Sequence, residues 1–207
     1  TILGWRDEEY YRSDPWRGSW EGEGGGVIVN QAPHQFDLLC WYMGEVAEVY
    51  GRWANINHPY IEVDDSAVAT VLFKSGGLAS IFVSNSQRPG IYAKVHIHGS
   101  SGASAGVQTD GGAMFIAGRS SVLEAPYNDI WTIPGQEECR AQWQKEDEEF
   151  FSHIDATWYF FAQQEEDFAR AILEGQAPSV SGSDGLQVAR IIEGIYRSNK
   201  KGVPVKY

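Results

Sequence analysis

The sequence contains few cysteines and has a deficit of positive charge. Cys40 and Cys139 are the two cysteines in 207 residues, which provides neither a disulfide framework nor the paired spacing of a structural zinc site. Against 28 Asp and Glu residues stand 16 Lys and Arg residues, so the formal net charge is −12. Because nucleic-acid binding requires clustered cations that neutralise phosphates, this balance argues against a nucleic-acid partner.

Long apolar runs are also missing. No stretch of about 18 consecutive apolar residues occurs, and the chain does not open with a basic and then an apolar segment, so we expect neither a membrane span nor a signal peptide. A reducing cytoplasm is the expected location. Aromatic residues, in contrast, are plentiful, with 8 Trp, 10 Tyr and 9 Phe. They indicate either a core and subunit interface of large side chains or a surface that stacks on sugars.

The G-x-G-x-x-G fingerprint of dinucleotide-binding folds does not occur. The most glycine-rich run, "GEGGG" at residues 22–26, has the wrong spacing and follows no clear strand. Strand and helix patterns do not alternate as they do in a doubly wound sheet. We therefore do not expect an N-terminal Rossmann domain within this chain.

The order of the hydrophobic patterns predicts an α+β fold with helices packed on one face of a sheet. A helix is predicted over residues 31–43, and glycine-containing hairpin connections are predicted at 74–77 and 100–103. Strands are expected at 2–11, 47–56, 66–73, 78–86, 91–99, 104–110, 113–118, 121–125, 130–133 and 203–207. Two helices are expected within 157–175 and 181–202, the second capped by Ser183 or Asp184. One domain over residues 1–207 is favoured over two small ones.

The segment "GGGVIVNQAPHQFDLL", residues 24–39, carries the most distinctive polar pattern. If the helix starts near Asn30, that residue is a plausible N-cap, and Pro33 lies in the first turn, where its missing N–H costs nothing. Asn30, His34 and Asp37 would then be neighbours on successive turns. His34 could accept a hydroxyl proton near neutral pH while Asp37 orients its ring. An ordinary structural contact at a helix start explains the same pattern.

A metal site is a weaker interpretation of these residues. His34 and Asp37 supply only two ligands, and no further Cys or His pair has an evident reason to approach them. His96 and His98 alternate on a predicted strand and would face the same side. They could form a ligand pair, but a half-exposed sheet face or a subunit contact explains them as well. We therefore expect no metal.

Five segments in this order make nearly the whole chain resemble a known domain. They read "YYRSDPWRG", "GGGVIVNQAPHQFDLLCWYMGEV", "VDDSAVATVLFKSGG", "VHIHGSSGAS" and "DFARAILEGQAPSVSGSDGLQVARIIEGIYRSNKKGVPV". The chain resembles the C-terminal domain of the glucose-fructose oxidoreductase / inositol dehydrogenase / MocA (Gfo/Idh/MocA) family. The resemblance implies an open, largely antiparallel sheet with helices on one side, of the dihydrodipicolinate-reductase type. It also implies substrate contacts, a homo-oligomer formed through the sheet face, and hydride transfer between NAD or NADP and a secondary alcohol of a sugar, nucleotide-sugar or cyclitol.

The resemblance also suggests roles for individual residues. His34 matches the family's acid/base histidine, and Asp37 matches the acidic residue that follows it, a supporting partner. Asn30 stands where inositol-dehydrogenase-like members carry an aspartate, and an amide can hydrogen-bond a hydroxyl but cannot exchange its proton. Arg12 and Arg17 are candidate substrate contacts, with surface or structural ion pairs as the alternative.

Two family features have no counterpart here. The nucleotide fingerprint and the catalytic lysine belong to the family's N-terminal domain, and Phe161 stands where relatives often carry a histidine. The start at Thr1 is typical of a fragment, so we expect this chain alone to bind cofactor weakly and to be inactive. One alternative is a stand-alone, non-catalytic carbohydrate-binding or oligomerisation module. Another is a glycoside hydrolase of the NAD-dependent kind.

Overall fold

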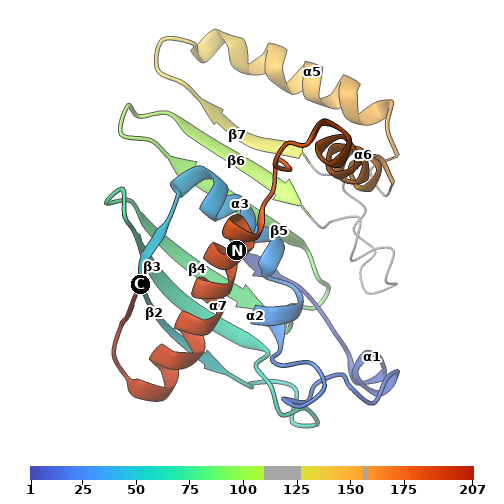
Figure 1. Cartoon of the computed structure of the whole chain (residues 1–207), viewed down its shortest axis with the longest axis vertical. Coiled ribbons are helices and arrows are strands. Elements are labelled where there is room, and N and C mark those ends of the chain that lie inside the picture. The colour runs from blue at the N-terminus through green and yellow to red at the C-terminus, as the bar shows by residue number, and fades with distance from the viewer. Residues whose placement is uncertain (110–126, 156–157) are drawn as a thin grey trace. The chain divides into compact units, whose positions relative to one another are not determined.

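The computed structural model describes residues 1–109, 127–155 and 158–207 and forms two compact units (Figure 1). One unit comprises Thr1–Ile91 with Gly182–Tyr207, and the other comprises Tyr92–Ser181. That both units belong to a single domain stays a prediction. The strands predicted at 113–118 and 121–125 lie outside the described residues.

An open, largely antiparallel sheet forms the first unit, as predicted. Its strand order is β1-β4-β3-β2-β8, in which β1 runs parallel to β4 and the other neighbours are antiparallel. The strands are β1 (Ile2–Leu3), β2 (Val46–Ala54), β3 (Ser66–Phe73), β4 (Leu78–Ser84) and β8 (Val205–Lys206). The predicted hairpin between β3 and β4 is confirmed, and Gly76 adopts the positive φ of 87° that its turn requires.

Helices cover one face of this sheet: α2 (Val27–Asn30), α3 (Pro33–Met43) and α7 (Gly182–Lys201) (Figure 1). The side chains of β3 alternate accordingly, so that Ala69, Val71 and Phe73 are buried. Their neighbours Val68 and Leu72 point to the opposite face and are exposed. The helix predicted over residues 31–43 is confirmed as α3, which begins two residues later than predicted.

Two glycines allow α7 to lie unusually close to β2. A Cβ atom added to Gly194 would lie 2.7 Å from Cβ of Val49, and one added to Gly51 would lie 3.1 Å from Ile195. The buried stripe of α7 consists of Ile191, Gly194, Ile195 and Ser198. The predicted cap at Ser183 or Asp184 is wrong, because α7 already begins at Gly182.

The strand predicted over residues 2–11 is wrong beyond Leu3. A short helix, α1 (Glu8–Arg12), replaces it, with Asp7 as the N-cap. Oδ1 of Asp7 accepts a hydrogen bond of 2.9 Å from the backbone N–H of Tyr10. An N-cap aspartate followed by two glutamates stabilises a helix start, and this local effect outweighs the strand preference of the aromatic residues.

The second unit has an antiparallel sheet in the order β7-β6-β5, formed by β5 (Tyr92–His98), β6 (Ser104–Thr109) and β7 (Tyr127–Thr132). A one-turn 3₁₀ helix (Glu137–Cys139) leads into α5 (Arg140–Ser152), a polar helix that was not predicted, and α6 (Tyr159–Glu174) ends at Gly175 as expected. No helix among the described residues is both long and apolar enough to cross a membrane.

Two glycines of α7, Gly194 and Gly185, should respond oppositely to substitution by alanine. Gly194→Ala should lower the free energy of unfolding by about 1–3 kcal/mol, because the added methyl group meets the rigid side chain of Val49. Gly185→Ala should raise it by about 0.5–1 kcal/mol, because its Cβ meets open space and alanine favours helix. Urea unfolding of both variants measures the difference, and equal effects would contradict the close packing of α7 on β2.

Candidate functional site

The glycine run before α2 allows the backbone to approach a buried carboxylate. The carboxylate oxygens of Asp64 accept hydrogen bonds of 2.9 Å from the backbone N–H groups of Gly26 and Ile28, and the hydroxyl of Tyr196 donates to Oδ1 at 2.6 Å. A Cβ on Gly26 would lie 1.8 Å from the carbonyl oxygen of Asp64, so no other residue fits there. Asp64, which lies 38 residues after Gly26 in the sequence, therefore caps the N-terminus of α2.

Asn30 does not occupy the predicted N-cap position. It ends α2, whereas α3 begins at Pro33 after Ala32, whose side chain makes no capping bond. The reason is that Asp64 starts a helical turn at Val27, so the backbone is already helical when it reaches Asn30. The position of Pro33 in the first turn of α3 is as predicted.

His34 is exposed in the first turn of α3, and Asp37 is half-buried one turn further on. Burial and the negative charge of Asp184 raise the pKa of Asp37, while the neighbouring His34 lowers it. Asp37 therefore lies within electrostatic reach of both His34 and Asp184. Asp184, which reaches this place from α7, was not among the predicted site residues.

The side chain of Asn30 joins a set of polar residues that the sequence did not single out as a group. Its Nδ2 donates to Oε1 of Glu23, and its Oδ1 accepts a hydrogen bond of 2.7 Å from Nε2 of Gln31. Oε1 of Gln31 in turn accepts a hydrogen bond of 2.9 Å from the guanidinium of Arg6. These partners are up to 25 residues apart in the chain, so no local spacing could have identified them.

Arg12 and Arg17 contact different partners. Each forms an ion pair, which is the alternative role named above. Arg12, with 75% of its side chain exposed, pairs with Glu8 at 2.5 Å. Nε of Arg17 contacts Asp14 at 3.0 Å, and its guanidinium stacks 4.3 Å from the ring centre of Tyr10. That Arg12 and Arg17 contact the substrate stays a prediction.

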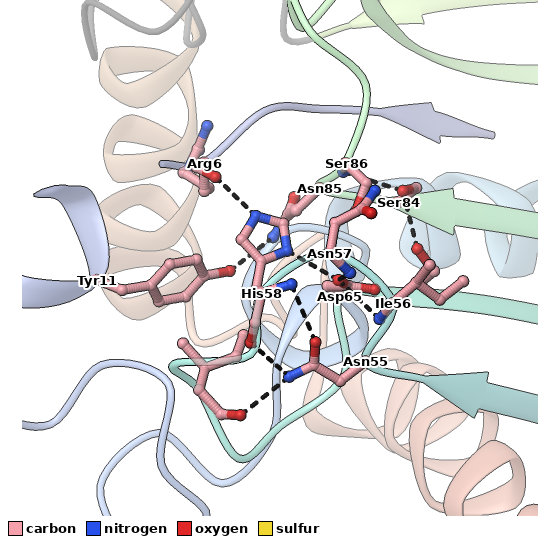
Figure 2. Close-up of polar contacts among 12 residues, drawn as sticks. Arg6, Tyr11, Asn55, Ile56, Asn57, His58, Asp65, Ser84, Asn85 and Ser86 are labelled. Carbon is pink, nitrogen blue, oxygen red and sulfur yellow. Dashed lines mark hydrogen bonds and ion pairs between the residues drawn. The ribbon is translucent and has the colours of Figure 1, made fainter. Parts of the chain in front are cut away.

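A buried histidine–aspartate pair contacts the backbone of Arg6 (Figure 2). Nδ1 of His58 lies 2.8 Å from Oδ2 of Asp65, and Nε2 lies 2.8 Å from the backbone carbonyl oxygen of Arg6. Both side chains are at most 1% exposed. Each ring nitrogen faces an oxygen that can accept a hydrogen bond, an arrangement that favours a hydrogen on both nitrogens and hence the imidazolium form of His58.

The electrostatics of this pair agree with that protonation state. Burial on its own would lower the pKa of His58, but the hydrogen bonds to Asp65 and Arg6 outweigh it and raise the pKa. Burial would raise the pKa of Asp65, but hydrogen bonds from His58 and from the backbone N–H groups of Asn57 and Ile56 lower it to about 2. His58 and Asp65 form no local motif, so this pair could not be predicted from the sequence.

His96 and His98 both lie on the exposed side of β5. Nδ1 of His98 forms a hydrogen bond of 2.8 Å with the hydroxyl of Ser104. Within residues 1–109, 127–155 and 158–207, no group of three or more His, Cys, Asp or Glu side chains is arranged to hold a metal ion.

Fold and site together define an α+β domain that presents a histidine at the start of a helix on one face of an open sheet. A sequence profile of the GFO/IDH/MocA C-terminal domain matches residues 1–105, half of the chain. The chain belongs to the Gfo/Idh/MocA family of oxidoreductases.

Individual relatives agree with this assignment. The uncharacterized oxidoreductase YrbE of Bacillus subtilis is 28% identical over 193 residues, which are 87% of this chain and 48% of YrbE. The WlbA dehydrogenase of Bordetella pertussis, solved with NADH and UDP-GlcNAcA, is 26% identical with a TM-score of 0.69 over 100% of this chain and 53% of its own. WlbA of Chromobacterium violaceum, with the same ligands, covers the same shares at 26% identity and a TM-score of 0.71. The chain spans about half the length of these relatives.

We expect His58→Ala to lower the free energy of unfolding by about 3–5 kcal/mol, because the variant leaves the Asp65 carboxylate buried without its counter-ion. The raised pKa of His58 means that its contribution is complete below pH 6.5 and is lost as the pH rises through the raised value. The pKa of Asp65, lowered to about 2, means that its contribution is complete above pH 3.8 and is lost as the pH falls toward 2. Wild type and variant should therefore differ most between pH 3.8 and 6.5.

Urea unfolding at a series of pH values measures this difference. Lys74→Ala is the control, because it removes an ion pair to Glu45 whose two side chains are more than half exposed, and it should change stability little at any pH. A His58→Ala effect that stayed constant across the whole pH range would contradict the ionised pair.

Proposed function

We propose that this chain is the substrate-binding part of an NAD(P)-dependent oxidoreductase that acts on a secondary alcohol of a sugar, nucleotide-sugar or cyclitol. The observation that carries the proposal is the exposed His34 in the first turn of α3, beside the half-buried carboxylate of Asp37, in a chain of this family. The two WlbA structures, solved with NADH and UDP-GlcNAcA, support a sugar-type substrate.

His34 would act as the acid/base. Its exposed ring can accept the carbinol proton as the substrate is oxidised, and return it in the reverse direction. The carboxylate of Asp37, which interacts electrostatically with His34, would stabilise the imidazolium that results. By resemblance, a catalytic lysine of the N-terminal domain would share this proton transfer.

The cofactor, NAD or NADP, supplies the hydride acceptor when bound. The glycine run of this chain does not fit a dinucleotide's phosphates, because the N–H groups of Gly26 and Ile28 already donate to Asp64. We therefore propose that the cofactor is bound mainly by an N-terminal domain outside this chain, and that the chain by itself is inactive.

Hydride-transfer assays of the full-length protein test this role. Against a panel of sugars, nucleotide-sugars and cyclitols, His34→Gln should lower kcat on the best substrate by about 10²–10⁴-fold, because glutamine cannot exchange a proton. His153→Gln, which alters another exposed histidine, should leave kcat unchanged. A His34→Gln variant with wild-type kcat would refute the acid/base role, and sugar binding without hydride transfer by the wild type would favour the non-catalytic module.

The uncovered face of the first unit's sheet supports a homo-oligomer. Val68 on β3 pairs in register with Phe82 on β4, so both point away from the helices, and they are 50% and 44% exposed. Leu72 and Tyr50 extend the same apolar face. Exposed apolar patches of this kind are typical of protein interfaces.

Phe82→Lys should dissociate the oligomer, because a charged side chain in an apolar interface is costly to desolvate. Analytical ultracentrifugation of the full-length protein measures the change in mass. Leu173→Lys is the control, because Leu173 is 87% exposed on α6 and lies outside this sheet face. The sheet interface would be wrong if only the control variant changed the mass.

A further inference from the structure

Four side chains, two of them at most four residues before His34 in the sequence, form one continuous chain of hydrogen bonds. The Arg6 guanidinium donates to Oε1 of Gln31 at 2.9 Å, Nε2 of Gln31 donates to Oδ1 of Asn30 at 2.7 Å, and Nδ2 of Asn30 donates to Oε1 of Glu23. The other oxygen of Glu23 accepts a hydrogen bond of 2.6 Å from the backbone N–H of Gly18. We call this set the amide relay: Arg6, Gln31, Asn30 and Glu23.

The chemistry of the two ends determines the direction of the relay. A guanidinium can only donate hydrogen bonds, and an ionised carboxylate can only accept them. Flipping the amide of Gln31 or Asn30 would place donor against donor or acceptor against acceptor at its contacts. Both amides therefore have a single orientation, although an isolated amide could adopt either of two.

Both ends of the relay are anchored in the protein. Arg6 is only 7% exposed, and its backbone carbonyl accepts the hydrogen bond from the buried His58. Its guanidinium also donates to the backbone carbonyl of Trp5 at 2.9 Å. Glu23 is anchored by Gly18 at the opposite end. The two amides in the middle are half-exposed and lie where α2 ends and α3 begins.

Each amide retains capacity for a ligand. A primary amide offers two N–H hydrogens and two carbonyl lone pairs, and the relay uses one of each on both Asn30 and Gln31. Each amide can therefore donate one further hydrogen bond and accept another. A hydroxyl group, which also donates and accepts, complements such an amide, and two adjacent amides complement two hydroxyls on neighbouring ring carbons.

We infer that the amide relay orients Asn30 and Gln31 to recognise a vicinal diol of the substrate next to His34, and that Arg6 and Glu23 are positioning residues for this recognition. The inference rests on the proposed function for the place of the substrate. Arg6 and Glu23 act without touching the substrate, because each is joined to it only through an amide.

A double-mutant cycle in the full-length protein tests the relay. Arg6→Met and Glu23→Gln each remove one charged end, and each should lower kcat/KM about 10-fold, the usual effect of losing a hydrogen bond to a charged group. Because both act through the same two amides, the double variant should also lose about 10-fold rather than about 100-fold. Glu21→Gln is the matched control, since Glu21 is an exposed carboxylate two residues from Glu23.

The second measurement is discrimination between diol and deoxy substrates. We would compare UDP-GlcNAcA with its 4-deoxy analogue, which lacks one of two neighbouring hydroxyls, and expect both relay variants to lose about 10-fold of the wild-type preference. A merely structural role of Arg6 and Glu23 would shift the urea midpoint without changing this ratio. Independent, multiplying effects of the two substitutions, or an unchanged ratio, would overturn the inference.

The two proposals can fail separately. If the wild type transfers no hydride, the proposed function fails, and the same cycle is then measured on the dissociation constants of UDP-GlcNAcA and its 4-deoxy analogue. Coupled losses of affinity would support the relay there, and independent losses or absent binding would overturn it. If the wild type is active and the cycle shows no coupling, only the relay is wrong.

Discussion

Two adjacent buried carboxylates, Asp64 and Asp65, set the arrangement on which the first unit depends. Both are fully buried, immediately before β3, and successive side chains of an extended backbone point to opposite sides. Asp64 therefore reaches α2 and caps it, while Asp65 reaches the loop that carries His58. A buried carboxylate is costly unless its charge is compensated, and here backbone N–H groups and an imidazolium compensate it.

The candidate site depends on both contacts. The cap from Asp64 starts α2 at Val27, and this turn places Asn30 and Gln31 just ahead of the helix that begins with Pro33 and carries His34. The pair of Asp65 and His58 anchors the carbonyl of Arg6, whose guanidinium orients the amide of Gln31. The exposed His34 thus follows, within four residues of the chain, two amides of defined orientation, and groups held in a defined orientation favour selective binding.

Much of the fold could be predicted because its signals are local. The alternation of β3, the glycine turn that follows it and the apolar pattern of α3 are each contained in about ten residues. Prediction failed where a local cap competed with an apparent strand, as at Asp7, and where a helix such as α5 lacks an apolar stripe. It also failed at Asn30, whose expected role as a cap is taken by Asp64.

The sequence by itself determined the order of the elements, the family resemblance, the absence of a dinucleotide fingerprint and the placement of His34 at a helix start. Only the tertiary structure decided which carboxylate caps α2, that His58 pairs with a buried carboxylate, and how the Asn30 amide is oriented. The reason is distance along the chain: Gly26 and Asp64 are 38 residues apart, and Arg6 and Gln31 are 25 apart. Residue periodicity reports on neighbours within a few turns, whereas these contacts exist only once the sheet has brought distant segments together.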